Sequence, residues 1–242
     1  MFRKISVVIM GLVLLVAGFG NVNAYNVKPG EILEYKVMVK SVIHGGNQTV
    51  KVIGFENYKN REVIRVRSTV TTVGLANQLT GYTETEEALL DAEEMYPVYF
   101  RREIRDNKKN EVDEVSFDYR RKVAVRVNSE TGKPEERTEI KLPGTLHDGL
   151  SLQFFFRKAE LKPGQHKLYF YSNGKVKDIA YTVRGVNRKL QLECGIFPGY
   201  LQVENPGVDI TILLSDNEER YPLIIRKISN IGKFEAKLQK VK

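Results

Sequence analysis

Three residues in the middle of the chain, His147, Asp148 and Ser151, are of the types that hydrolysis by a nucleophile requires. Positions four apart share one face of a helix, so His147 and Ser151 would lie close together there, whereas the adjacent His147 and Asp148 would diverge. The Gly-x-Ser-x-Gly elbow of many hydrolases is absent from the sequence. Acid–base hydrolysis, including that of carbohydrates, would need Asp148 and the distant Asp216 to meet in the fold. A helix cap with a surface pair is the favoured interpretation, and a hydrolase using Asp148, His147 or Asp216 is the alternative.

Metal-ligating residue types are scattered along the chain. His44, His147 and His166 are far apart, and Cys194 is the only cysteine. Ligands of a structural zinc normally come in closely spaced pairs, which this pattern lacks. Cys194 lies in an apolar, strand-like segment and is expected to be buried. Phosphate-binding glycine loops are also missing from the sequence, so we expect neither a metal nor a cofactor.

The beginning of the chain has the pattern of a cleavable secretory signal peptide, residues 1–24. A basic start, Met1 to Lys4, precedes an apolar run from Ile5 to Phe19 that is short for a membrane span. Val22-Asn23-Ala24 fits a signal peptidase site, which would make Tyr25 the first mature residue. A lipid anchor is not expected, because no cysteine follows that site. The sequence therefore predicts an exported protein, in the periplasm of a Gram-negative bacterium or secreted.

The formal charge of +8 includes Arg3 and Lys4 of the signal peptide, so the mature chain carries two fewer positive charges. Acidic and basic residues alternate along it, which favours an ordinary solvated surface over a dedicated anion-binding one. The candidate partners are a lipid, a lipoprotein or an anionic envelope component. Nucleic acid is not expected, because no recognition motif is present and the chain is exported. No further apolar run is long enough for an integral membrane span, and the oligomeric state stays open.

Alternating polar and apolar residues indicate β-strands along most of the mature chain. Leu33, Tyr35 and Val37 share one side of the first strand. Asn173-Gly174 predicts a tight hairpin, since both residues tolerate the positive φ of a type I′ turn. Further strands are predicted at residues 49–55, 64–72, 98–105, 114–119, 122–127, 136–141, 165–172, 176–183, 189–196, 208–215 and 223–231. We predict a mainly β single domain over residues 25–242, a large curved antiparallel sheet forming an open or half barrel, or a sandwich.

One segment departs from this alternation. Leu146, Leu150 and Phe154 recur every four residues, and the pattern from Thr145 to Asp148 resembles a helix cap. The spacing predicts one short packing helix near residues 146–158, whose apolar face covers one end or one face of the sheet.

Several stretches together resemble an exported bacterial family known only as domain of unknown function 3108. They are Pro29 to Val37, Met95-Tyr96-Pro97, Asp148 to Ser151 with Phe155-Phe156-Arg157, and Leu214-Ser215-Asp216 with Arg220 and Pro222. The likeness spans nearly all of the mature chain. It departs at the last motif, where Leu213 replaces a Trp and Asn217 a second Asp of the family pattern.

The resemblance implies an envelope-associated all-β protein, comparable in shape with the curved half-barrels that carry lipoproteins or lipids, and it implies no activity. Its shared residues are interpreted as structural: turns, core and helix cap. They are Gly30, Glu31, Tyr35, Pro97, Asp148, Ser151, Arg157, Ser215, Asp216 and Pro222.

Function is left to three hypotheses. The leading one is a non-enzymatic periplasmic protein that binds an apolar or amphipathic ligand, or an envelope component, on the concave face of the sheet. Its expected ligand-binding residues are Tyr35, Val37, Tyr169 and Tyr171. The second is the hydrolase or carbohydrate-active enzyme above. The third, a structural scaffold of envelope assembly, predicts no cavity.

Overall fold

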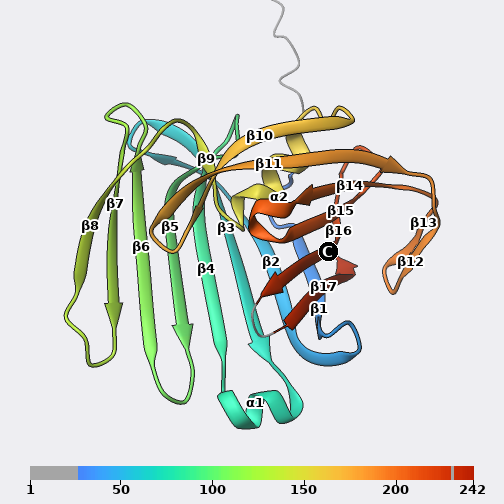
Figure 1. The fold of residues 1–242 in the computed structure, drawn as a ribbon, viewed down its shortest axis with the longest axis horizontal. Helices are drawn as coiled ribbons and strands as arrows, with labels where there is room; N and C mark the ends of the chain where they lie inside the picture. Colours follow the sequence, from blue (N-terminus) through green and yellow to red (C-terminus); the bar gives the residue numbers. More distant parts are fainter. Residues whose placement is uncertain (1–26, 230–231) are drawn as a thin grey trace, which may run out of the picture.

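The computed structural model describes residues 27–229 and 232–242, so the predicted signal peptide lies outside the described residues. Strands make up most of this part of the chain (Figure 1). The first eight are β1 (Ile32–Val39), β2 (Ile43–Tyr58), β3 (Arg61–Thr72), β4 (Thr83–Asp91), β5 (Pro97–Arg105), β6 (Asn110–Asp118), β7 (Val123–Glu130) and β8 (Glu136–Lys141). The others are β9 (Leu146–His147), β10 (Gly164–Ser172), β11 (Lys175–Val186), β12 (Leu190–Leu192), β13 (Gly195–Phe197), β14 (Tyr200–Asn205), β15 (Ile210–Ser215), β16 (Pro222–Ser229) and β17 (Gly232–Val241).

Fifteen of these strands form one curved sheet in the order β8-β7-β6-β5-β4-β3-β2-β1-β17-β16-β15-β14-β11-β10-β9. Neighbours are antiparallel except β9 and β10. In Figure 1, β3 to β8 stand side by side as one wall, while β10, β11 and β14 to β16 run across as a second wall. The sheet edges β8 and β9 are joined by only four residues, 142–145, so the walls approach each other at one end. The predicted open, curved antiparallel sheet is confirmed.

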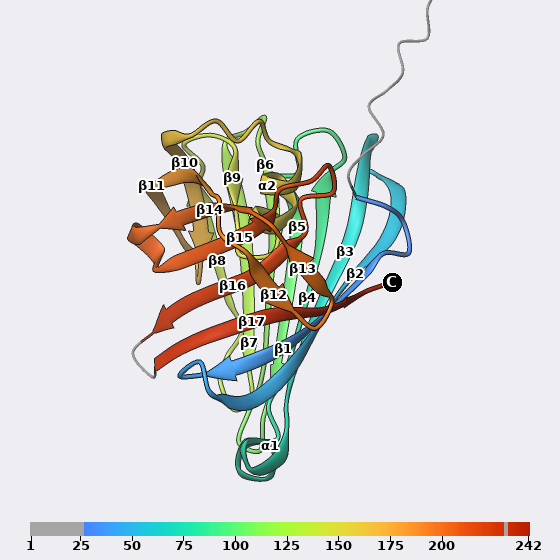
Figure 2. The ribbon, with the colours of Figure 1, turned by 90° about the vertical axis from the view of Figure 1, so that its right-hand side faces the viewer.

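The first and last strands pair in the middle of the sheet. Strands β1 and β17 are antiparallel, and Ile32 and Lys242 exchange backbone hydrogen bonds of 2.9 Å in both directions. The side view in Figure 2 shows β1, β16 and β17 passing across the long strands β3 to β8. This pairing joins two meanders, β1 to β8 and β10 to β17, into one continuous hydrogen-bonded surface.

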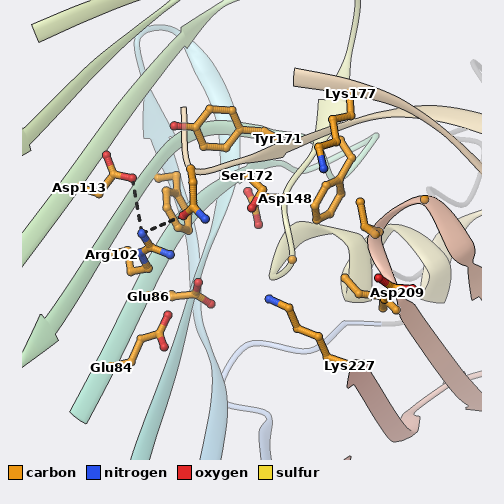
Figure 3. A pocket seen from close by; sticks show the side chains of 17 residues that line it. Glu84, Glu86, Arg102, Asp113, Asp148, Tyr171, Ser172, Lys177, Asp209 and Lys227 are labelled. Atoms are coloured by element: carbon orange, nitrogen blue, oxygen red, sulfur yellow. Dashed lines mark hydrogen bonds and ion pairs between the residues drawn. The ribbon is translucent and has the colours of Figure 1, made fainter. Parts of the chain in front are cut away.

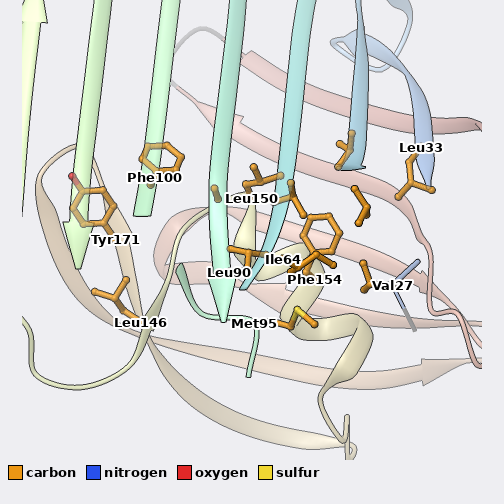
Figure 4. Packing of buried hydrophobic residues seen from close by; sticks show 14 of the residues in the cluster. Val27, Leu33, Ile64, Leu90, Met95, Phe100, Leu146, Leu150, Phe154 and Tyr171 are labelled. Carbon is orange, nitrogen blue, oxygen red and sulfur yellow. The ribbon is translucent and has the colours of Figure 1, made fainter. Parts of the chain in front are cut away.

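Helix α2 (Ser151–Lys158) lies between the two walls and connects their cores. Leu150 and Phe154 pack with Ile64 and Leu90 of the first wall (Figure 4). On the other side, Phe156 packs with residues of β10, β11, β14 and β15. All five of these side chains are buried. The predicted packing helix is therefore confirmed, and truncating a buried Phe such as Phe154 to Ala typically costs about 3–5 kcal/mol.

The start of this helix differs from the prediction. Leu146 and His147 form β9, and the helix begins at Ser151. Asp148, rather than Thr145, supplies the cap: its Oδ1 accepts hydrogen bonds from the amides of Leu150 (2.8 Å) and Ser151 (2.9 Å). The apolar spacing of four residues continues across the cap because strand β9 also buries Leu146. In the sequence, the segment therefore resembles one longer helix.

The tight hairpin is present as predicted, since Ser172 pairs with Lys175 and both Asn173 (φ 49°) and Gly174 (φ 75°) have positive φ. A second helix, α1 (Gly74–Thr80), was not predicted; it exposes Leu75 and Leu79 at the tip of the β3–β4 hairpin.

Three strands also escaped prediction, namely β4, β14 and β17. The single strand predicted at residues 189–196 is instead the hairpin β12–β13, with Cys194 in its turn. Cys194 is half-buried, not fully buried, and packs against the main core. Within the described residues, no helix has the length and apolar character needed to cross a membrane.

Candidate functional site

The concave face of the first wall changes from apolar to charged along each strand. On β4, Ala88 and Leu90 are buried in the core, and the residues two and four positions before Ala88 on the same face are Glu86 and Glu84. On β5 the same face carries Phe100 and then Arg102. The charged side chains begin where the core around α2 ends.

A cavity of about 300 Å³ lies at this transition (Figure 3). Its volume is at the lower end of the range for small-molecule sites. One part of the lining is aromatic or aliphatic, with Phe100, Phe170, Tyr171, Val208 and Ile210. The charged lining residues are Glu84, Glu86, Arg102, Asp113, Asp148, Lys177, Asp209 and Lys227. Gly149, Ser172, Asn173 and Gly207 complete the lining.

Asp148 lies at the inner end of this cavity, and only 3% of its surface is exposed. Its Oδ1 atom caps α2, and its own amide donates to Ser151 Oγ at 2.8 Å. The second carboxylate oxygen, Oδ2, is buried, and no hydrogen-bond donor among the described residues reaches it. Burial raises the pKa of Asp148, an effect that the amides of Ser151 and Leu150 oppose. One oxygen of Asp148 therefore caps the helix, and the other is buried without a hydrogen-bond partner among the described residues.

Glu86 faces the same space from β4 (Figure 3). Its pKa is raised to about 8, first because burial disfavours the ionised carboxylate and then because Glu84 and Asp148 repel it. Arg102 and Lys227 attract the carboxylate and limit the rise. At neutral pH, Glu86 is therefore mostly protonated, whereas an added positive charge would favour its ionised form.

A polar network forms the outer side of the cavity. Arg102 donates to Asn173 Oδ1 at 3.1 Å and lies 3.9 Å from Asp113 Oδ2, and Arg126 Nε donates to Asp113 Oδ1 at 2.7 Å. Arg102 Nε is buried, and none of the described residues accepts a hydrogen bond from it. A donor and an acceptor of this cavity, Arg102 Nε and Asp148 Oδ2, thus both lack partners within the described chain.

The residues of the hydrolase hypothesis do not assemble. His147 lines a separate surface cavity and packs against Phe155 with ring centroids 4.2 Å apart, while the adjacent Asp148 faces the cavity described above. Burial lowers the pKa of His147 to about 3, which keeps it uncharged. Ser151 Oγ accepts the amide of Asp148, and Asp216 is exposed in the β15–β16 turn. His147, Asp148 and Asp216 therefore face three different environments.

Two residues of the family pattern, Glu31 and Arg157, form a buried ion pair, and together with Tyr221 we call them the clamp. Two nitrogens of Arg157 donate to the two carboxylate oxygens of Glu31 at 2.6 and 2.9 Å. Arg157 Nε donates to the carbonyl of Glu219 at 3.1 Å, and the guanidinium lies 5.2 Å from the ring centroid of Tyr221. Arg157 is 0% and Glu31 6% exposed. The clamp ties α2 to the beginning of β1 and to the β15–β16 turn.

The other residues of the pattern lie beside the clamp or in turns. Tyr35 Oη donates to the carbonyl of Pro222 at 3.0 Å, and Ser215 Oγ accepts the amide of Tyr221 at 2.8 Å. Gly30 has φ 83° in the turn before β1. Pro97 begins β5, and its carbonyl accepts a hydrogen bond from Tyr119 at 2.9 Å.

The residues expected to bind a ligand are divided between core and cavity. Tyr35 is buried, and Val37 and Tyr169 are partly buried against the same core. Tyr171 lines the cavity, and its hydroxyl accepts the amide of Gly174 at 3.2 Å.

Sequence reasoning did not identify Glu84, Glu86, Arg102 and Lys227 as site residues. A usable signal was the alternation Thr83-Glu84-Thr85-Glu86, which has strand period but carries acids where an ordinary strand carries apolar residues. An acidic inner face on a strand indicates a solvated or ligand-filled interior.

Comparisons with known proteins agree with this architecture. A family model described as "Protein of unknown function (DUF3108)" matches residues 34–239. Among solved structures, the chain is similar to a "Beta-barrel-like Protein of Domain of Unknown Function DUF1849 from Brucella abortus", with 12% sequence identity and a TM-score of 0.55. The match covers 88% of this chain and 97% of that one, and at this identity it shows the fold alone. None of the curated proteins compared with the chain matches it.

Proposed function

The chain belongs to the DUF3108 family of proteins of unknown function, and we propose that it is an exported, non-enzymatic binding protein that holds the polar head of an amphipathic ligand in the cavity between its two walls. One observation carries the proposal. A cavity with an aromatic wall and a charged wall ends at Asp148 Oδ2, a buried acceptor without a donor among the described residues. Unfilled acceptors of this kind cost stability in a folded protein unless water or a ligand satisfies them.

The charged lining favours an amphipathic ligand over a wholly apolar one. Placing hydrocarbon against Glu84, Arg102 and Lys227 would strip their water without replacing its hydrogen bonds, which is costly. Phe100, Phe170 and Tyr171 provide apolar contact on the other side. A ligand that has one polar and one apolar end matches both.

Binding is favoured over hydrolysis because the candidate catalytic groups are separated and engaged. Ser151 serves the helix start, His147 is buried against Phe155, and Asp216 is exposed in a turn. A purely structural scaffold has no need of a cavity that ends in an unpartnered carboxylate oxygen.

Export is part of the proposal and rests on the signal-peptide pattern of residues 1–24. The full chain should be expressed and recovered from the periplasm, and its intact mass should correspond to a polypeptide beginning at Tyr25. Recovery of the uncleaved chain from the cytoplasm would contradict export.

The binding function is tested by native mass spectrometry of the exported protein. We expect a co-purifying amphiphile that is released on unfolding and whose occupancy falls about tenfold in Asp148→Asn, as expected for the loss of a charged hydrogen-bond partner. The matched control is Glu139→Gln, which removes a carboxylate from the exposed strand β8. Protein that carries no amphiphile and takes up none in direct titration would contradict the proposal.

A further inference from the structure

Among the described residues, the cavity has one buried acceptor without a hydrogen-bond partner, Asp148 Oδ2, and one buried donor without one, Arg102 Nε. Ionised carboxylates only accept hydrogen bonds. Asp148 is 3% exposed and lines the cavity together with Glu86 and Glu84 (Figure 3). Glu84 accepts a hydrogen bond from Tyr82. A ligand that matches Asp148 Oδ2 must donate a hydrogen bond.

The charge of the lining has the same implication. The charged residues of the cavity comprise five acids and three bases, whereas the whole chain has a formal charge of +8. Two of the bases, Lys177 and Lys227, and one of the acids, Asp209, are exposed, and Lys227 lies close enough to attract the carboxylate of Glu86. The interior is thus locally acidic in a basic protein, which attracts a cation to this position.

Resting on the proposed binding function, we propose that the head group held in this cavity is a primary ammonium, bound between the carboxylates of Glu86 and Asp148. An ammonium has three donors and a compact charge. It satisfies Asp148 Oδ2 and neutralises the repulsion between the two acids. The aromatic wall then contacts the first methylenes of the ligand.

A calcium ion fits this cavity less well than an ammonium. Calcium takes six to eight oxygen ligands, largely from carboxylates, carbonyls and water. Here one oxygen of Asp148 caps α2, Glu84 is engaged with Tyr82, and Asp113 is engaged with Arg126. Three of the five acids are thus partly engaged, and calcium requires more oxygen ligands than the three donors of an ammonium require acceptors.

Ammonium binding would be linked to proton release from Glu86. The charged groups that face Glu86 are Glu84 on its own strand, Arg102 from β5, Asp113 from β6, Asp148 before α2, Lys177 from β11, Asp209 before β15 and Lys227 from β16. Glu86 is mostly protonated below its pKa of about 8. A bound ammonium stabilises the carboxylate, so affinity increases as pH rises toward about 8 and then levels off.

The test is calorimetric titration of the exported protein with octylamine, octanol and octanoate, which share one tail and differ in head group. We expect octylamine to bind at least about tenfold more tightly than octanol at pH near 8, because its hydrogen bonds are charge-assisted. Its affinity should fall by up to about tenfold per pH unit below 8, with one proton released per ligand. An alkylammonium stays charged throughout this range, since its pKa is close to that of lysine, about 10.4.

Glu86→Gln should abolish the pH dependence and weaken octylamine about tenfold while leaving octanol unchanged, because only the charge is removed. Glu139→Gln should behave as the wild type. Equal affinity for octylamine and octanol, or tightest binding of octanoate, would overturn the ammonium inference and leave the amphiphile-binding function standing. Failure of all three probes to bind would overturn both.

Discussion

Two regions of this protein bury charge, and they differ in how completely that charge is satisfied. In the clamp, Arg157 and Glu31 form two parallel hydrogen bonds of 2.6 and 2.9 Å, and Arg157 also serves the carbonyl of Glu219. In the cavity, the charge of Asp148 contributes to the raised pKa of Glu86, and one oxygen of Asp148 has no donor within the described chain.

We interpret the difference as one between charges that hold the fold and charges that the proposed ligand would satisfy. A buried ion pair with well-made hydrogen bonds fixes the arrangement of the elements that carry it. Two neighbouring acids work against folding when both are ionised, and strongly shifted pKa values cluster at functional sites. Both regions contact helix α2: the clamp holds its last turn through Arg157, and the cavity reaches its start through Asp148. The helix therefore links the clamp at one end to the cavity at the other.

The largest expected effect comes from breaking the clamp. Arg157→Met should lower the free energy of unfolding by about 3–5 kcal/mol, because it leaves Glu31 buried without its partner. Urea denaturation measures the change. The control is Arg184→Met, which breaks the exposed pair with Glu204 and should cost no more than about 1 kcal/mol.

A double variant sharpens this prediction. Glu31→Gln combined with Arg157→Met removes both charges, so it should recover part of the stability that Arg157→Met alone loses. If the single Arg157→Met variant is as stable as the wild type, the clamp does not hold the fold.

The sequence predicts most of the first region and little of the second. Alternation at Leu33, Tyr35 and Val37 identifies β1, and the apolar spacing of Leu150 and Phe154 identifies α2. These signals follow from burial, which acts locally and repeats with the period of each element. The resemblance to the family drew attention to Glu31 and Arg157, although not to their pairing across 126 positions.

The cavity escaped prediction because its residues come from six or more separate elements. Glu86 lies on β4, a strand hidden by its acidic first half, and Lys227 reaches the cavity from β16. The two walls form one continuous sheet because β1 pairs with β17, a contact that no local pattern encodes. The sequence identifies Asp148 as a helix cap, but it does not show that Oδ2 is buried without a donor, because that depends on the residues packed around it.

A second prediction concerns the pH dependence of stability. The pKa of Glu86 is raised to about 8 in the folded protein, from about 4.3 in the unfolded chain, so the folded state holds this proton more strongly. The contribution of protonated Glu86 to the free energy of unfolding is fully present below about pH 4.3 and is lost as the pH rises toward 8.

Glu86→Gln should therefore match the wild type in stability near pH 4 and be more stable by about 2 kcal/mol near pH 9. This difference is smaller than the full pKa shift would give, because water in the cavity screens the charge of ionised Glu86. Urea denaturation at both pH values measures this difference, with Glu139→Gln as control. A wild type and variant that differ equally at both pH values would show that Glu86 titrates normally.

The smallest effect is expected at Asp216, the exposed acid of the family pattern. Asp216→Asn should change the free energy of unfolding by no more than about 0.5 kcal/mol, because the residue is in a solvated turn. Octylamine binding should also be unchanged. A marked loss of binding in this variant would place the β15–β16 turn in the functional region and blur the distinction between the two regions.

The ionisation of Glu86 itself tests the central claim most directly. A ¹³C NMR titration of glutamate carboxyl groups, assigned by comparison with Glu86→Gln, measures its pKa in the free protein and with saturating octylamine. We expect a pKa near 8 for Glu86 in the free protein, falling by at least about one unit when the ammonium binds. A pKa close to the ordinary value of about 4.3 in the free protein, or one that octylamine leaves unchanged, would contradict it.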